Sequence, residues 1–316
     1  MKSLVDITWV HPSRGSKQMG TKTYWTRALE QSERALMSGA LVPLSTSLEH
    51  LFRSPESHFE LRTLESRLPK HLKIDGPKPN PFQPWDPSLE VATLNPGHAV
   101  ILNKYPVQRG HMLLITKDWA AQDGWLTLAD WRALVCVDQD TSGLWFFNSG
   151  PIAGASQPHR HLQLLPRSKD ETSCPRDLWF LNRLISKGTY ESSSDPLLNG
   201  CSVISRFHHS NDVDEQAQDL QDSYLSLSKQ LGIGHPSQDH RPRSFYNLLL
   251  TPQWMAMVRR RQEGAAGFSI NALGFAGYLL ATANSDLNWL KTHGPEALLR
   301  EVILEIRGNT VVKRTP

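Results

Sequence analysis

Two pairs of apolar runs constrain the fold of this chain most strongly. The first pair is HAVILNKYP (98–106) and HMLLITKD (111–118), and the second is SFYNLLLT (244–251) and WMAMVRR (254–260). Each pair is joined by a short segment with turn-forming residues, VQRG or TPQ, and therefore predicts an antiparallel β-hairpin. Hairpins within one chain favour an antiparallel sheet over a parallel one.

Helical patterns alternate with these hairpins. Thr127 and Asp130 have capping-box spacing and predict the start of a helix over 128–139. Further elements are expected from apolar periodicity: helices at 22–40 and 215–231, and buried strands at 143–150 and 159–166. The chain is therefore expected to have an α+β fold.

Composition excludes several classes of protein. Of 316 residues, 39% are hydrophobic and 21% charged, and 34 Lys and Arg against 31 Asp and Glu give a net charge of +3, which does not favour a nucleic-acid binder. Three cysteines without CxxC spacing argue against a disulfide framework and against a cysteine-built zinc site, and suit a reducing compartment. The first residues, MKSLVDITWVHPSRGSK, lack the apolar run and the small-residue cleavage site of a secretory signal, and the longest apolar stretch, around 272–283, is too short to cross a bilayer. A cytoplasmic protein without membrane contact is expected.

A polar stretch divides the chain. We predict an N-terminal catalytic unit over 1–170, a linker over 171–200 with a short helix, and a C-terminal unit over 201–316. The segment DGPKPNPFQPWDP (75–87) holds five prolines and is expected to be a loop packed on the surface.

The stretch NSGPIAGASQPHRHLQ (148–163) carries the chemistry. Alternate side chains of a strand share a face, so His159, His161 and Gln163 are expected to project together, opposite Leu162 and Leu164. A neutral imidazole is a good nucleophile towards phosphorus. The glycines and serines before the strand supply backbone and hydroxyl donors for an anion, so the pattern predicts nucleotidyl transfer through a covalent histidine intermediate.

Other interpretations of the histidine strand stay open at this point. The loop is not a Walker-type phosphate loop, because no GK[ST] follows it and a strand comes next. His159 and His161 could ligate zinc, but no third ligand is evident nearby. Two histidines on a strand could also be hydrogen-bonded structural residues.

This stretch resembles the active-site segment of the diadenosine tetraphosphate phosphorylases, also called ATP adenylyltransferases. They belong to the histidine-triad superfamily and are related to the galactose-1-phosphate uridylyltransferases. VILNKYPVQRGHMLLITKD, PNPFQPWDP, YNLLLTPQWMAMVRRR and INALGFAGYLL are similar to other segments of the family. The resemblance implies a histidine-triad-like antiparallel sheet with flanking helices and a C-terminal portion that completes the site.

The resemblance also implies roles for individual residues. His161 is implied as the nucleophile, His159 as a supporting residue, and Gln163 as the amide that replaces a third histidine. The implied substrate-binding residues are Lys70, Asn103, Lys104, Asn148, Ser149, Gly154, Ala155, Ser156, Gln157, Asn247 and Arg259. No protein-bound metal is implied.

The implied activity is phosphorolysis of diadenosine tetraphosphate (Ap4A) to ADP and ATP, and the reverse reaction, through an adenylyl-histidine. Its partners would be diadenosine polyphosphates, ATP, ADP and inorganic phosphate, with Mg²⁺ or another divalent cation carried by the substrate. The alternatives are another nucleotidyltransferase, of the adenylylsulfate or uridylyl type, and a non-catalytic nucleotide-binding sensor.

Overall fold

The computed structural model describes residues 22–65, 80–94, 96–168, 170–185, 200–206 and 210–305. An eight-stranded sheet forms its centre, in the order β3-β4-β5-β7-β6-β9-β10-β8, and every neighbouring pair is antiparallel. Its strands are β3 (Glu90–Leu94), β4 (His98–Leu102), β5 (Met112–Thr116), β6 (Gly143–Asn148), β7 (His161–Pro166), β8 (Cys201–Ser205), β9 (Tyr246–Leu250) and β10 (Trp254–Arg259). The α+β prediction and both predicted hairpins are confirmed.

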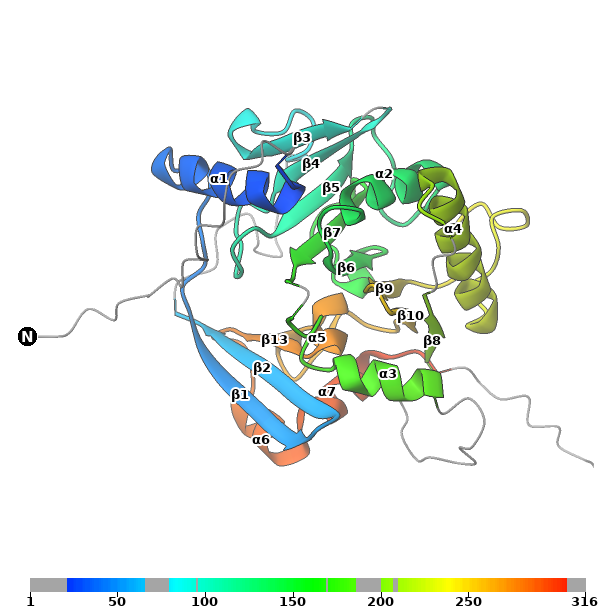
Figure 1. The fold of residues 1–316 in the computed structure, drawn as a ribbon. Helices are drawn as coiled ribbons and strands as arrows, with labels where there is room; N and C mark the ends of the chain where they lie inside the picture. Colours follow the sequence, from blue (N-terminus) through cyan, green and yellow to red (C-terminus); the bar gives the residue numbers. More distant parts are fainter. Residues whose placement is uncertain are drawn as a thin grey trace, which may run out of the picture.

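Three helices cover one face of this sheet: α1 (Tyr24–Met37), α2 (Leu128–Asp138) and α4 (Val213–Gln230) (Figure 1). Helix α2 begins at the predicted capping box, in which the Thr127 hydroxyl accepts from the Asp130 N–H and the Asp130 carboxylate accepts from the Thr127 N–H. The apolar stripes of these helices pack on one core with the side chains of alternate sheet residues, including Leu162 and Leu164. This face of the sheet is therefore a packing surface.

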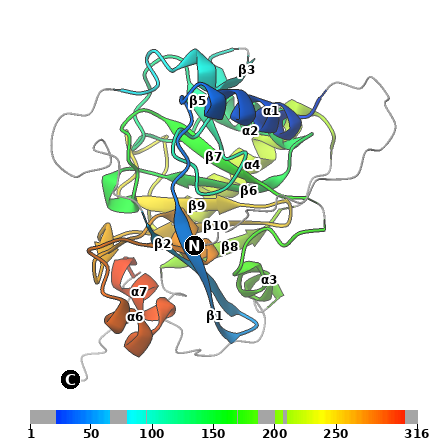
Figure 2. The same ribbon diagram turned by 90° about the vertical axis from the view of Figure 1, so that its left-hand side faces the viewer.

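A second layer covers part of the opposite face, and Figure 2 shows the large sheet between it and helices α1, α2 and α4. It contains a three-stranded sheet of β1 (Thr46–Ser54), β2 (Ser57–Leu64) and β13 (Tyr278–Ala281), with helices α3 (Asp177–Ile185), α5 (Ala272–Ala276), α6 (Leu287–His293) and α7 (Pro295–Val302). Two short strands, β11 (Gly264–Ala265) and β12 (Phe268–Ser269), and two 3-10 turns, η2 (Pro87–Leu89) and η3 (Pro151–Ala153), complete the described elements. A separate core lies between this layer and the sheet.

The two halves of the chain share the large sheet. Strand β6 pairs with β9, and Asn148 lies opposite Asn247. The boundaries proposed at 170 and 200 stay a prediction, but residues from both sides of them meet in adjacent strands. A site on this part of the sheet therefore draws on both halves.

Among the described residues, no helix combines the length and apolarity needed to cross a bilayer.

Candidate active site

His161 is the first residue of β7 and is held at both its backbone and its ring. Its N–H donates to Gln122 Oε1 (2.8 Å), and its ring Nδ1 donates to the carbonyl oxygen of His159 (2.8 Å). Because Nδ1 carries the proton, Nε2 carries a lone pair, and no described residue hydrogen-bonds Nε2. This is the tautomer that an imidazole nucleophile requires.

His159 is anchored by its own ring bonds. Its Nε2 donates to the Thr116 carbonyl oxygen (2.9 Å), and its Nδ1 accepts from Asn80 Nδ2 (2.9 Å). Both ring nitrogens are thereby occupied. His159 therefore fixes the start of β7 and the carbonyl that orients His161, and it has no free lone pair for substrate.

Both histidines are covered by another part of the chain. His159 is fully buried and His161 is 3% exposed, because Phe82 packs with ring centroids 5.6 and 5.3 Å from theirs. Phe82 itself is buried against Ile101 and Ile115. The described part of the proline-rich segment, residues 80–87, is the expected loop packed on the surface, and it lies over the histidines. Proline content predicted the loop but gave no signal for its position.

This cover changes the acid–base properties of the site. Burial lowers the pKa of His161 to about 4, although the hydrogen bond to the His159 carbonyl acts in the opposite direction. Burial also lowers the pKa of His159. His161 is therefore neutral at physiological pH without a general base.

The depressed pKa values predict that the protein loses stability in mild acid. His161 and His111 both have a pKa of about 4, below the value of 6.5 that each has when unfolded. The unfolded chain therefore binds protons first as pH falls, so this contribution is complete above about pH 6.5 and declines towards pH 4. We expect up to about 1.4 kcal/mol per pH unit for each histidine in urea unfolding, and a shallower slope for His161→Asn. Equal unfolding free energies at pH 7 and pH 5 would contradict the burial argument.

Two side-chain amides lie on the same face as His161. Phe146 pairs with Gln163, so Asn148, two residues further along β6, comes beside His161. The Asn148 Oδ1 accepts from Asn247 Nδ2 (2.8 Å) and from the Ala272 N–H (2.9 Å). The Asn148 NH2 group has no partner among the described residues and is the end that can donate to a substrate oxygen.

The Gln163 amide is oriented in the same way, with its oxygen bonded and its NH2 group free. Its Oε1 accepts from His111 Nε2 (3.0 Å), and its NH2 group has no partner among the described residues. His111 was not among the predicted site residues, although it begins one of the predicted strands. Its contact with Gln163 joins β5 to β7 across the sheet, so it could be found only once the register of these strands was known.

Two predicted contacts from the C-terminal half occupy other positions. Asn247 is fully buried, and its Nδ2 donates to the Asn148 Oδ1 and to the Ala153 carbonyl. It therefore orients the Asn148 amide and holds the glycine-rich loop. Arg259 pairs with Tyr246, a residue of the helix-covered core, and therefore lies on the face opposite His161. Its neighbour Arg260 is on the site side and donates to Asn247 Oδ1 (2.6 Å). Arg259 itself donates to the Ser244 hydroxyl (3.2 Å), and its role in substrate binding stays a prediction.

In the glycine-rich loop, some of the backbone N–H groups that could have held an anion bond within the loop instead. Gly154 N–H donates to the Pro151 carbonyl (2.9 Å) and Ala155 N–H to the Gly150 carbonyl (3.0 Å). These two amides are therefore not free to hold a phosphate, contrary to the expectation from the sequence. The next two N–H groups, of Ser156 and Gln157, have no acceptor among the described residues, and the Ser156 side chain is exposed.

Gly154 is required by both conformation and space. Its φ is +82°, and a Cβ there would lie 2.7 Å from the Asn271 Cβ and 2.9 Å from the Ile270 carbonyl oxygen. Gly154→Ala should therefore cost more than the ~1–2 kcal/mol of a left-handed alanine and should displace the loop, lowering turnover. Gly232→Ala is the matched control, because Gly232 has φ +63° and nothing within 4 Å of its Cβ position. Urea unfolding and turnover of both variants check this, and equal losses would contradict the steric argument.

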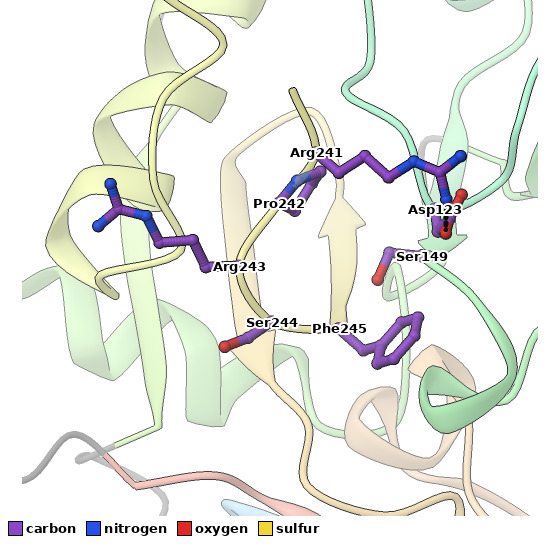
Figure 3. A pocket seen from close by; sticks show the side chains of 7 residues that line it. All are labelled: Asp123, Ser149, Arg241, Pro242, Arg243, Ser244 and Phe245. Atoms are coloured by element: carbon purple, nitrogen blue, oxygen red, sulfur yellow. Dashed lines mark hydrogen bonds and ion pairs between the residues drawn. The ribbon is translucent and has the colours of Figure 1, made fainter. Parts of the chain in front are cut away.

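A cavity of about 100 Å³ opens beside this loop (Figure 3). Its lining consists of Asp123, Ser149, Arg241, Pro242, Arg243, Ser244 and Phe245. Arg241 reaches across to donate to Asp123 (2.7 Å), whereas Arg243 turns away and bonds Asp239 (2.8 Å). Ser149 Oγ accepts from the Tyr246 N–H (2.7 Å), so the hydroxyl hydrogen of Ser149 is left to donate.

The remaining predicted substrate-binding residues are Lys70, Asn103 and Lys104, and they do not gather at one place in the described structure. Lys70 lies outside the described residues. Lys104 is exposed in the turn between β4 and β5. Asn103 is partly buried, and its side chain bonds His111 and the Tyr105 N–H. Because His111 in turn bonds Gln163, Asn103 is linked to Gln163 through His111.

A buried ionic network holds the strand from the other face. Arg160, between the two histidines, donates to Asp130 Oδ2 (3.0 Å), and His98 Nε2 donates to Asp130 Oδ1 (2.9 Å). Burial alone would raise the pKa of Asp130, but the bonds from His98, Arg160 and Thr127 outweigh it and lower the pKa. The ionised carboxylate therefore joins β4, β7 and the start of α2.

The site thus combines a neutral imidazole that has a free Nε2 with amide donors on the same face of an antiparallel sheet, an arrangement suited to nucleophilic attack on phosphorus. Comparison with known proteins then identifies the family. Residues 14–178 match the Ap4A phosphorylase N-terminal domain, and residues 199–305 match the ATP adenylyltransferase C-terminal domain. The chain therefore belongs to the Ap4A phosphorylase family.

Individual relatives agree with this assignment. Protein APA1 of Saccharomyces cerevisiae is 29% identical over 231 residues, which cover 67% of this chain and 69% of the relative. Diadenosine 5',5'''-P1,P4-tetraphosphate phosphorylase 2 of the same yeast is 27% identical over 236 residues, 65% of this chain and 70% of the relative. The crystal structure of yeast Apa2 with AMP covers 92% of this chain and 100% of its own, at a TM-score of 0.69 and 22% identity, so the fold is shared.

Proposed function

We propose that this protein is an Ap4A phosphorylase, which cleaves Ap4A with inorganic phosphate into ADP and ATP and also runs the reverse reaction. The observation that carries the proposal is the state of His161: neutral, with its proton on Nδ1 and its Nε2 unpartnered among the described residues. Membership of the family supplies the substrate class, since the family model and one of the two yeast relatives are named for Ap4A phosphorylase.

The first half-reaction follows from this geometry. Nε2 of His161 attacks an α-phosphorus of Ap4A, a P–N bond forms, the P–O bond to the remaining triphosphate breaks, and ATP leaves. The imidazole then carries a positive charge, which the His159 carbonyl stabilises through the Nδ1–H bond. The free NH2 groups of Asn148 and Gln163 donate to the non-bridging oxygens, where charge accumulates.

The second half-reaction reverses the roles. An oxygen of inorganic phosphate attacks the adenylyl phosphorus, the P–N bond breaks, and ADP leaves with His161 restored to the neutral state. Phe82, packed over both histidines, limits access of water to the adenylyl-histidine. A water-poor site favours transfer to phosphate over hydrolysis.

We propose that Mg²⁺ enters with the polyphosphate. The donors at the site are amides, imidazole and hydroxyl groups, and the described residues contain no cluster of three or more His, Cys, Asp or Glu that could hold a metal. Phosphate oxygens would therefore provide most of the ligands, which is a common mode of Mg²⁺ binding in proteins. The metal would neutralise charge on the departing triphosphate. The cysteine usage fits action in the cytoplasm.

The proposal is tested by the products. The protein is incubated with Ap4A and Mg²⁺, with and without inorganic phosphate, and nucleotides are separated by ion exchange. With the protein in catalytic amounts, ADP that appears only with phosphate, together with ATP in excess over the protein, supports a phosphorylase. AMP and ATP without phosphate would indicate a hydrolase, and no products in either case would contradict the proposed activity.

A further inference from the structure

Three hydrogen bonds connect a backbone amide to Gln163. The Tyr105 N–H donates to Asn103 Oδ1 (3.1 Å), Asn103 Nδ2 lies 3.1 Å from His111 Nδ1, and His111 Nε2 lies 3.0 Å from Gln163 Oε1. We call these side chains of Asn103, His111 and Gln163 the amide relay. It runs from the turn between β4 and β5 to the middle of β7.

The relay has one direction. A backbone N–H can only donate, so the Asn103 Oδ1 must accept and its Nδ2 must donate to His111 Nδ1. A neutral histidine has one ring proton, which is then on Nε2 and is donated to the Gln163 Oε1. His111 is 4% exposed, and burial lowers its pKa to about 4, so the ring stays neutral. The NH2 end of Gln163 is left over at the end of the relay.

Gln163 lies on the same face of β7 as the nucleophile His161, because it is two residues further along the strand. Non-bridging phosphate oxygens accept hydrogen bonds, so an amide with the opposite orientation would place its own lone pairs against them. The orientation of this amide therefore decides whether Gln163 attracts or repels the phosphate.

We propose that His111, fixed by Asn103, is a positioning residue that holds the Gln163 amide with its NH2 group towards the adenylyl phosphate. The proposal deepens the proposed function and rests on it for the identity of the phosphate. The alternative is a purely structural role, because the His111 ring also packs against Phe146, with 5.8 Å between the two ring centroids. A structural residue would change stability, but its effect on rate would not depend on Gln163.

A double-mutant cycle separates the two roles. His111→Phe keeps the ring volume and loses the donor, and Gln163→Met keeps the chain length and loses the amide. Loss of the Gln163 donor should lower kcat about 10²–10³-fold, and His111→Phe should lower it at least about tenfold in the parent chain. In the Gln163→Met background, His111→Phe should have no further effect on kcat. The same fold-loss in both backgrounds would overturn the proposal, and urea unfolding of all four proteins records stability separately.

A second variant reverses the relay without removing the ring. In Asn103→Asp the carboxylate accepts from His111 Nδ1, so a neutral His111 must accept from Gln163 at Nε2 and turn the Gln163 oxygen towards the phosphate. A doubly protonated His111 would preserve the original orientation. The groups that act on its charge are the introduced carboxylate, His161 and Arg167. We therefore expect kcat/KM of Asn103→Asp to fall as pH rises through the new pKa of His111. The parent, and the double variant that also carries Gln163→Met, should not show this fall. A pH profile parallel to that of the parent would contradict the relay.

AMP binding keeps this test independent of the proposed reaction. Titration calorimetry of AMP should show weaker binding for His111→Phe in the parent and unchanged binding in the Gln163→Met background. If the parent does not phosphorolyse Ap4A, the proposed function fails while the calorimetric cycle still decides the relay. Equal weakening in both backgrounds would overturn it.

Discussion

His161→Asn should lower the rate of Ap4A phosphorolysis by at least about a thousandfold, because it removes the nucleophile on which both half-reactions depend. The shorter amide can still donate to the His159 carbonyl, so the strand should stay in place. Initial rates with saturating Ap4A and phosphate, together with AMP binding, measure the two effects. Binding should persist when turnover is lost.

The matched control for this substitution is His293→Asn. His293 is an exposed residue of α6 that bonds the Trp289 carbonyl, far from the histidine strand in the chain and absent from the site. It should retain the parental rate. Turnover by His161→Asn within tenfold of the parent would show that Nε2 of His161 does not attack phosphorus.

Asp130→Asn should cause the largest loss of stability among single substitutions at charged residues. The change leaves the Arg160 guanidinium, whose side chain is 9% exposed, without its carboxylate. The one amide oxygen that remains can accept either from His98 or from the Thr127 N–H of the capping box, so one of these two bonds is lost as well. Breaking one partner of a buried ion pair costs about 3–5 kcal/mol, and we expect a loss in that range in urea unfolding.

Glu301→Gln provides the comparison. Glu301 pairs with Arg261 at the surface, where their side chains are 50% and 47% exposed, and such pairs contribute about 0–1 kcal/mol. Asp130→Asn should also lower kcat, because Arg160 stands between His159 and His161 in the chain. A stability loss no greater than that of Glu301→Gln would refute the role given to this network.

The sequence predicted the parts of the site that depend on local pattern. Strand alternation placed His161 and Gln163 on one face and Leu162 and Leu164 in the opposite core. The capping box of α2 was also found, because it depends on two residues three positions apart. These features need no knowledge of which strands are neighbours.

The remaining features depend on contacts between distant segments. The sequence alone did not predict the cover by Phe82, the support of Asn148 by Asn247, or the His111–Gln163 bond. Each of these contacts joins residues at least 52 positions apart in the chain. The parallel pairing of β13 with β2 is of the same kind, since it joins residues 278–281 to residues 60–63. The internal bonds of the glycine-rich loop also escaped prediction, because glycine permits either an open nest or a closed turn.

A single-turnover experiment detects the adenylyl-histidine itself. Protein in excess is mixed with Ap4A and Mg²⁺ without phosphate, quenched under alkaline conditions that preserve a P–N bond, and examined by intact mass and peptide mapping. We expect one adenylyl group on the peptide that contains His161, release of an equal amount of ATP, and conversion of the adenylyl group to ADP when phosphate is added. Release of ATP without a labelled peptide, a label on another residue, or no ATP until phosphate is present would contradict the covalent mechanism.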